Sequence, residues 1–267
     1  MNPARPSKSR FLIPASVRFL LALAVGVVLF APRLWLAAEA PDAAAKAKNK
    51  AEKVKEDRLD VDRRQQDEFF DKQDVPYFRF DFLPEEWEYI HKDPRRFAEC
   101  TLMDGDNPKL WKAVAVKLKG SASFRGPDDK PGLSISMAKY QKADRWRGFL
   151  KWHLNNGVQD STFLNEQISC EIARKAGVPA SRCAHALVKW QGRDLGLYVF
   201  KEAFDQDFLA KYYQNTDGDL YDGGRYPADI RLDMDKELGD PLRRDNLKEL
   251  IGASEERDPK KRWDRLE

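Results

Sequence analysis

A small-residue loop flanked by cations is the part of this sequence most suited to chemistry. Lys119 is followed by Gly120 and Ser121, and Arg125 and Lys130 come soon after them. Backbone N–H groups in such a loop can approach phosphate oxygens, and the cationic side chains can neutralise their charge. The alternative is an ordinary turn between two antiparallel strands. The residue order excludes a Walker A loop, which needs Gly-Lys-Ser/Thr at the start of a helix, and the Gly-x-Gly-x-x-Gly of protein kinases.

Three glutamates are candidates for roles in such a site, two of them as partners of a lysine. Glu166 and Glu171 fall on a predicted helix, where a glutamate usually faces solvent. Either one gains a role if it positions a strand lysine, such as Lys130 or Lys139, against phosphate. Glu202 ends a predicted strand, so it is either a strand-end charge or a residue at a hinge between two lobes.

A cluster of aspartates invites a calcium interpretation. Asp217, Asp219 and Asp222 bracket glycines, and a nearby turn adds Asp229, Asp233 and Asp235. A calcium loop needs oxygen ligands at its positions 1, 3 and 5 and a glutamate at position 12, and the third acid here comes one residue late. A structural turn is the favoured interpretation, with a calcium-stabilised turn as the alternative, and we assign no metal ligand.

The cysteines and histidines show no spacing typical of a metal or redox motif. Cys100, Cys170 and Cys183 include no Cys-x-x-Cys pair, and the three histidines are dispersed. An odd number of cysteines allows at most one intramolecular disulfide and leaves one thiol over. We expect partly buried thiols.

The first forty residues are typical of a secretory signal. A basic leader precedes an uncharged apolar run at residues 19–30, and small residues at positions 38 and 40 fit a cleavage site. We expect cleavage, with an uncleaved membrane anchor as the alternative, and no other contact with a membrane. The chain has 47 basic and 44 acidic residues, of which residues 1–40 hold five and one. The remaining net charge of −1 gives no argument for a nucleic-acid partner, and export predicts a secreted or cell-envelope location.

Composition divides the rest of the chain near residue 69. Residues 41–68 are charged and Ala-rich with almost no large apolar side chains, which predicts a linker, either a tether or a solvated helix. Residues 70–267 have the apolar content of a folded domain. Period-two alternation predicts strands at 78–82, 113–119 and 133–137 and a hairpin at 186–200. Apolar residues at helical spacing after Asp160 predict one principal helix, so the fold class is α+β, an antiparallel sheet with one helix.

From about residue 75 to its end, the chain resembles the CotH (spore coat protein H) kinase family. The likeness rests on segments that follow one another in the family's order. They are VKLKGSAS at 116–123, DKP at 129–131, WRGFLKWHLNN at 146–156, AGVPA at 176–180, GRDLGLYVFKE at 192–202 and GDLYDG at 218–223. Any one of them alone would be weak, but together and in order they are specific.

The resemblance implies an atypical protein-kinase-like fold, with an N-lobe antiparallel sheet, one principal helix and the start of a helical C-lobe. It also implies ATP with Mg or Mn, and transfer of the γ-phosphate to Ser or Thr of an exported protein substrate. Lys130 would hold phosphate, with Glu166 as its helix partner or Glu171 as the alternative, and Glu202 would lie beside the adenine. The expected nucleotide-binding residues are Lys119, Gly120, Ser121, Arg125, Lys130, Glu166 and Glu202.

The sequence departs from the family near its C-terminus. In the family, an Asn-Asn-Tyr segment and a later aspartate resemble the base region and the metal-binding aspartate of kinases, and neither occurs before Glu267. Trp263 and Asp264 belong to a polar helix that precedes them in the family. We therefore expect the catalytic residues downstream of Glu267, and no phosphate transfer by this chain alone. The alternative function is a non-catalytic extracellular protein with a binding or structural role in a coat or envelope.

Overall fold

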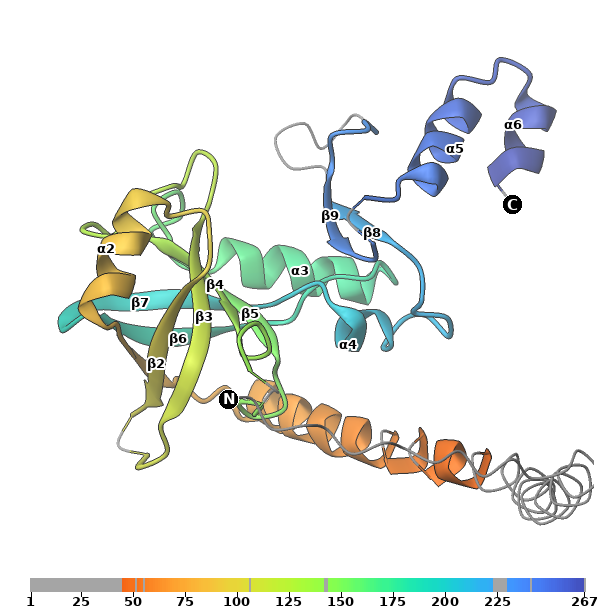
Figure 1. Ribbon diagram of the computed structural model, residues 1–267. Helices are drawn as coiled ribbons and strands as arrows, with labels where there is room; N and C mark the ends of the chain where they lie inside the picture. Colours follow the sequence, from red (N-terminus) through yellow and green to blue (C-terminus); the bar gives the residue numbers. More distant parts are fainter. Residues whose placement is uncertain are drawn as a thin grey trace, which may run out of the picture. The chain divides into compact units, whose positions relative to one another are not determined.

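The computed structural model describes residues 45–50, 52–54, 56–105, 107–141, 144–222, 230–240 and 242–266 (Figure 1). The chain divides into two compact units, Met1–Arg58 and Leu59–Glu267. In the first unit, residues 45–50, 52–54 and 56–58 are helical. The signal expected at residues 1–40 lies outside the described residues. Among the described residues, no helix is both long enough and apolar enough to cross a membrane.

Seven strands of the second unit close into one barrel. They are β1 (Tyr77–Asp81), β2 (Ala98–Asp104), β3 (Trp111–Lys119), β4 (Gly132–Ser136), β5 (Lys151–Asn155), β6 (Cys183–Trp190) and β7 (Arg193–Glu202). Around the barrel the order is β1-β2-β3-β4-β5-β7-β6, and β6 pairs with β1 to complete the ring. This closing pair is parallel, with Tyr77 opposite Leu187 and Phe80 opposite Trp190, whereas the other pairs are antiparallel.

The barrel shows that the kinase-like fold expected from the resemblance is wrong. The described residues form a closed mixed barrel with few helices, not an N-lobe sheet followed by a helical C-lobe. Apolar alternation indicates where strands lie, but it carries no information on which two edges of the sheet meet. β1 closes the barrel, since its backbone pairs with β2 on one side and with β6 on the other. Its side chains Phe78 and Phe80 are fully buried in the core.

Aromatic side chains form the core inside the barrel. The Trp152 ring of β5 stacks on the Phe200 ring of β7 with centroids 5.9 Å apart, and the Phe78 ring lies 4.8 Å from that of Trp146. All four side chains are at most 1% exposed. Rings of this size bury large apolar surfaces, and the interior is a packed core. The polar chemistry of the protein therefore lies on the outer face of the barrel or at its ends.

Residues 59–72 are helical and pack onto this aromatic core. Phe69 is 1% exposed, and Gln66 Nε2 donates a hydrogen bond of 2.8 Å to the Gly148 carbonyl. The helix passes close to Gly148, where a Cβ would lie 2.1 Å from the Asp62 carbonyl oxygen. The charged segment predicted as a linker thus ends in helical turns that belong to the packed unit.

The remaining elements are α2 (Pro84–Lys92), α3 (Asn165–Lys175), α4 (Gln206–Leu209), α5 (Asp245–Ser254), α6 (Pro259–Leu266) and the ribbon of β8 (Leu220–Asp222) and β9 (Asp235–Leu238). The principal helix predicted from apolar spacing is α3, which lies against β6 (Figure 1). Its apolar stripe is turned outward, since Ile168 and Ile172 are 51% and 63% exposed. A polar side of α3 that includes Glu166 instead faces the barrel, because the strand surface beneath the helix is itself polar.

Candidate functional site

A row of polar residues crosses the outer face of the barrel next to α3. In register on neighbouring strands stand Lys117 of β3, Ser134 of β4, His153 of β5, Lys201 of β7 and Cys183 of β6. Cross-strand partners share one face of a sheet, and side chains alternate between faces along each strand. On β3, β4 and β5 the neighbours of these residues along the strand are buried apolar residues, so the row belongs to the outer surface.

Glu166, in the first turn of α3, contacts two polar residues of this face. Its Oε1 lies 3.4 Å from Lys201 Nζ, and its Oε2 accepts a hydrogen bond of 2.5 Å from Asn155 Nδ2. Asn155 Oδ1 in turn accepts from Lys119 Nζ at 3.0 Å. One helix carboxylate thus positions two lysines from separate strands, one directly and one through an amide. We call Lys119, Asn155, Glu166 and Lys201 the lysine–glutamate cluster.

Gly132 leaves the space through which Lys119 reaches Asn155. It is the first residue of β4 and pairs with Lys119 across the ladder between β3 and β4. A Cβ at Gly132 would lie 3.2 Å from the Lys119 carbonyl oxygen and 3.5 Å from Lys119 Cγ. The absence of a side chain at this position therefore lets the lysine cross from β3 to the end of β5.

The electrostatic field on this face favours an anion. Burial lowers the pKa of His153 well below its ordinary value, and the charges of surrounding lysines lower it further. These lysines are Lys119, Lys151, Lys201 and Lys117. Burial opposes the charge of Lys201, but the carboxylate of Glu166 and further partners outweigh it and raise the pKa of Lys201. The imidazole is therefore neutral at neutral pH while the lysines are charged, and Glu166 offsets only part of their charge.

Side chains from three other segments hold the loop between β3 and β4 by donating to its carbonyl groups. Asn156 is 3% exposed, and its Nδ2 donates to two loop carbonyls at 3.0 and 2.8 Å. Trp190 Nε1 and Tyr198 OH donate to two proline carbonyls of the loop, each at 3.0 Å. Arg193 donates to three loop carbonyls. The path of the loop is thus fixed before any ligand binds.

The predicted loop residues follow directly on Lys119. Gly120 has a φ of 114°, and a Cβ there would lie 2.7 Å from Ser123 Oγ, so the position requires glycine. Ser121 is exposed. Arg125 donates to the Phe124 carbonyl at 2.7 Å and pairs with the carboxylate of Asp129 at 3.5 Å. Arg125, which was predicted to neutralise phosphate, therefore pairs with an acidic residue of the same loop.

Lys130, predicted to hold phosphate with Glu166 as its partner, lies in a different environment. Its Nζ donates to the Leu197 carbonyl at 2.9 Å and sits 4.9 and 5.0 Å from the ring centroids of Phe163 and Tyr198. Burial lowers the pKa of Lys130. The strand lysine that Glu166 holds is Lys201. The alternative glutamate, Glu171, pairs with Lys175 at 2.8 Å on the exposed side of α3.

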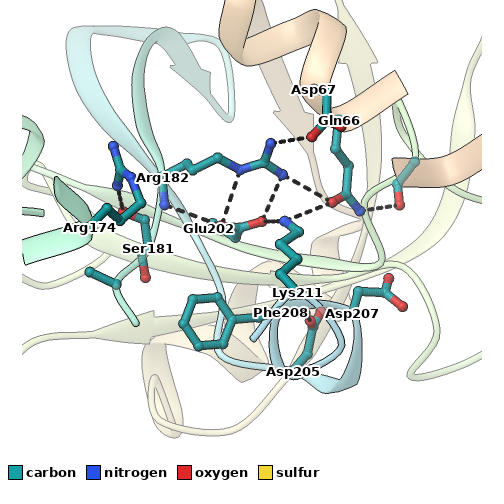
Figure 2. A network of polar contacts seen from close by, with 12 residues as sticks. Gln66, Asp67, Arg174, Ser181, Arg182, Glu202, Asp205, Asp207, Phe208 and Lys211 are labelled. Carbon is teal, nitrogen blue, oxygen red and sulfur yellow. Dashed lines mark hydrogen bonds and ion pairs between the residues drawn. The ribbon is translucent and has the colours of Figure 1, made fainter. Parts of the chain in front are cut away.

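Glu202, predicted beside an adenine, lies in a buried ionic network on the other face of the sheet (Figure 2). Its Oε1 lies 3.0 Å from Arg182 Nη2 and also pairs with Lys211. Arg182 Nη1 reaches Asp67 at 2.5 Å, and both cations contact Gln66 (Figure 2). Burial raises the pKa of Glu202, but the two cations outweigh burial and the pKa is lowered. The structure therefore uses Glu202 to fix the helix at 59–72 onto the barrel.

The loop, α3 and the lysine–glutamate cluster all fall within a region that matches a known family. The family model, described as CotH kinase protein, matches residues 116–266, which is more than half of the chain. This chain belongs to the CotH kinase protein family. The inner spore coat protein H of Bacillus subtilis (strain 168) is 26% identical to it over 126 residues, which cover 46% of this chain and 34% of that relative. The matched part thus spans about a third of the relative's length.

Sequence reasoning missed four polar residues of this CotH chain, although the segments that carry them were recognised. They are His153, Asn155, Asn156 and Lys201. In β5, His153 and Asn155 alternate with the buried Trp152 and Leu154, so strand geometry places both on the outer face. The same alternation separates Lys201 from Glu202. The sequence did not reveal that α3 turns its glutamate, and not its isoleucines, toward that face.

Two aspartates of the cluster in the CotH chain, Asp219 and Asp233, form ion pairs. Asp219 Oδ2 lies 2.7 Å from Lys236 Nζ, and the hydroxyl of Tyr221 contacts the same carboxylate. Asp229 lies outside the described residues. In the described part of the chain, no group of three His, Cys, Asp or Glu side chains could hold a metal ion.

Proposed function

We propose that this CotH chain carries the nucleotide-binding part of a phosphotransferase that acts on Ser or Thr of exported proteins. The observation that supports the proposal is the contact of 3.4 Å between Glu166 of a helix and Lys201 of a strand. In protein kinases, a strand lysine held by a helix glutamate contacts the phosphates of ATP. The barrel is not a kinase fold, so the likeness concerns the pair of side chains and their task.

The outer face suits a triphosphate in access and in charge. The side chains of Lys201 and Glu166 are 25% and 36% exposed, so a ligand can reach both. Four lysines surround His153, and they give this face its positive charge. Ammonium groups bind phosphate oxygens strongly. Beside these lysines, Ser134 Oγ and His153 Nδ1 are buried without a hydrogen-bond partner among the described residues. Buried polar atoms of this kind are typical of sites that hold a further polar group.

Each residue of the cluster has a role in this proposal. Phosphoryl transfer depends on positioning and on neutralising charge, not on a covalent intermediate with the protein. Lys201 and Lys119 neutralise phosphate oxygens, while Glu166 and Asn155 hold the two ammonium groups in place. Mg or Mn, when bound with ATP, supplies further neutralisation of the phosphates. We assign no residue of the described chain to that metal, because none of them forms a suitable ligand group.

Calorimetric titration with ATP tests the proposed site. We expect Lys201→Met and Glu166→Gln to weaken ATP binding at least tenfold. Lys175→Met and Glu171→Gln are matched controls, since this pair lies exposed on the same helix, and they should bind like the parent chain. Equal affinity of all five proteins would remove the cluster from the site. Transfer of radiolabelled γ-phosphate to a Ser- or Thr-containing protein substrate, with Mg or Mn, tests the activity itself.

The name of the Bacillus relative, an inner spore coat protein, favours a second candidate function, that of a structural protein of a coat. Both candidates place the protein in a coat or elsewhere outside the cytoplasm. A coat protein without catalysis would fractionate with coat or envelope material, and it would bind no ATP in the titration above. Fractionation together with ATP binding that depends on Lys201 would favour the phosphotransferase.

A further inference from the structure

Two of the three cysteines meet beside the lysine–glutamate cluster. Cys170 lies one helical turn after Glu166 on the same side of α3, and Cys183 stands opposite Lys201 in the ladder between β6 and β7. The helix α3 packs against β6, and Cys170 lies close enough to Cys183 to raise the pKa of that thiol. The pair Cys170 and Cys183 therefore lies next to the pair Glu166 and Lys201. Cys170 is one helical turn after Glu166, and Cys183 is on the strand beside that of Lys201.

The third cysteine is kept apart from this pair. Cys100 lies in β2, is 4% exposed and stands opposite Val114. Burial raises the pKa of Cys100 well above its ordinary value, and the charges that act on it are those of Asp81, Glu99 and Glu86. Of the three pairings that three cysteines allow, the structure therefore favours one.

We propose that Cys170 and Cys183 form a reversible disulfide that fastens α3 to β6 next to Glu166 and Lys201. Both residues are free thiols in the structure, and the contact of Glu166 with Lys201 brings the helix side that carries Cys170 next to the strand that carries Cys183. Cys170 is half-buried, whereas Cys183 is 5% exposed. An oxidant from solution therefore meets Cys170 first.

A small disulfide such as oxidised glutathione supplies the oxidising equivalents. The Cys170 thiol loses its proton, its sulfur attacks one sulfur of glutathione disulfide, and the first glutathione leaves as a thiolate that takes up a proton. The Cys183 thiol then loses its proton, attacks Cys170 Sγ and releases the second glutathione. Two protein thiols are oxidised to one disulfide, and one glutathione disulfide is reduced to two thiols. Burial and the neighbouring Cys170 raise the pKa of Cys183, so the second step is slow and accelerates as pH rises.

The consequence for the ligand site rests on the proposed function. Glu166 and Cys170 are on one side of the same helix, so a bond at Cys170 restrains the glutamate that holds Lys201. Oxidation should keep the two lysines of the cluster in place and strengthen nucleotide binding. Reduction should let α3 move away from the barrel and weaken it. The disulfide itself, however, is inferred from the proximity of the two thiols and does not depend on ATP.

Mass spectrometry of tryptic peptides tests the disulfide directly. The whole chain is equilibrated with oxidised glutathione, alkylated and digested without reduction. We expect a linked pair of peptides that contain Cys170 and Cys183, with Cys100 alkylated. Cys100→Ser should retain the link, and Cys170→Ser should lose it. A link that involves Cys100, or three alkylated cysteines in a chain with native circular dichroism, would overturn the inference. The peptides of the wild-type chain decide whether the disulfide forms, even if a variant fails to fold.

A second pair of measurements separates this inference from the proposed function. The bond closes a loop of about 14 residues and should raise the melting temperature of the wild-type chain by roughly 5–10 °C, with no change in Cys170→Ser. ATP titration of both redox forms should show tighter binding after oxidation. A linked chain that binds no ATP in either form would contradict the proposed function and leave the disulfide standing. A chain that binds ATP but forms no link would contradict only the disulfide.

Discussion

Lys201 and Glu202 are consecutive residues of β7, and their side chains belong to two separate charge clusters on opposite faces of the sheet. Lys201 pairs with Glu166 on the outer face, whereas Glu202 pairs with Arg182 and Lys211 in a buried network. The first cluster is partly open to solvent, and the second fixes a helix to the barrel. Substitutions at the two positions should therefore have different effects, one on a ligand and the other on stability.

Glu202→Gln should lower the free energy of unfolding by about 3–5 kcal/mol. The change leaves Arg182 and Lys211 buried without their shared carboxylate, and breaking a buried ion pair from one side costs about this much. Urea denaturation followed by circular dichroism measures it. Glu171→Gln, which breaks an exposed pair with Lys175, is the control and should change stability little. Similar midpoints for the two variants would show that the buried network contributes nothing.

His153 should stay neutral down to well below pH 6.5, and its pKa should rise when Lys201 is replaced by Met. Burial sets the low pKa of His153, and the lysine charges around it contribute further, so loss of one positive charge favours the protonated ring. Titration of the imidazole by NMR measures both values. Lys175→Met on the exposed side of α3 should leave the His153 pKa where it was. A ring that titrates normally in the parent chain would refute the basic field on this face.

Asp205 should make the protein less stable as pH rises from about 4 to about 7. Burial raises the pKa of Asp205 from 3.8 to about 6, although its carboxylate also accepts the Phe208 N–H at the start of α4. A pKa raised by folding means that the fold favours the protonated acid, so this contribution is complete below pH 3.8 and is lost as pH rises through 6. The loss amounts to about 3 kcal/mol, since one pKa unit is about 1.4 kcal/mol.

Asp205→Asn isolates this effect from the other titrating groups. Asparagine remains a good helix cap but carries no titratable proton. The difference in unfolding free energy between parent and variant should therefore shift against the parent by about 2 kcal/mol between pH 4 and pH 7. Glu202 changes stability in the opposite direction, because its lowered pKa makes stability fall as pH falls. Parent and variant both contain Glu202, so its contribution cancels in the difference between them. A constant difference across this range would disprove the raised pKa.

Asn156→Ala should release the loop between β3 and β4. Two hydrogen bonds from the buried amide to loop carbonyls are lost, at a cost of about 2–3 kcal/mol. Hydrogen exchange of the amides at 120–131 should become faster than in the parent chain, and faster than in Ser121→Ala, which alters an exposed hydroxyl of the same loop. Unchanged exchange would show that the other donors hold the loop without Asn156.

Phe69→Ala should destabilise the barrel, although residue 69 lies before the first strand. Its ring is 1% exposed and lies 4.9 Å from the ring of Phe200, so its removal leaves a cavity that costs about 3–5 kcal/mol. Val61→Ala, at a side chain that is 44% exposed, should stay within about 0.5 kcal/mol of the parent. Thermal denaturation of the three proteins checks this, and equal melting temperatures would show that the helix is not part of the folding unit.

Local features of this fold were predictable from the sequence, and its closure was not. Alternation in β3 and β4 and the apolar spacing of α3 correspond to elements that the structure contains. The parallel contact between β1 and β6 joins residues more than a hundred positions apart, and no local pattern reports such a pairing. The resemblance implied a kinase-like fold because the family's short segments describe a loop and a helix rather than the topology of a sheet.

The candidate site was predictable in its residue types but only partly in its partners. Glu166 was expected to hold a strand lysine, and the structure gives it Lys201 where Lys130 was expected. The apolar spacing that includes Ile168 and Ile172 predicted the helix, but not which of its sides faces the barrel, and both side chains are exposed. Which side of a helix faces a sheet depends on the surface below it, and here that surface is polar.

The parallel pairing of β1 with β6 also determines when this barrel can form. One edge of β1 stays open until residues 183–190 have been made and have folded back with β7, because Tyr77 must meet Leu187. Contacts of such long separation in sequence are slow to form, and an unpaired strand edge is where chains associate wrongly. The pairing of β1 with β6 should therefore limit the rate of refolding. A chain that stops before β6 should be prone to aggregate.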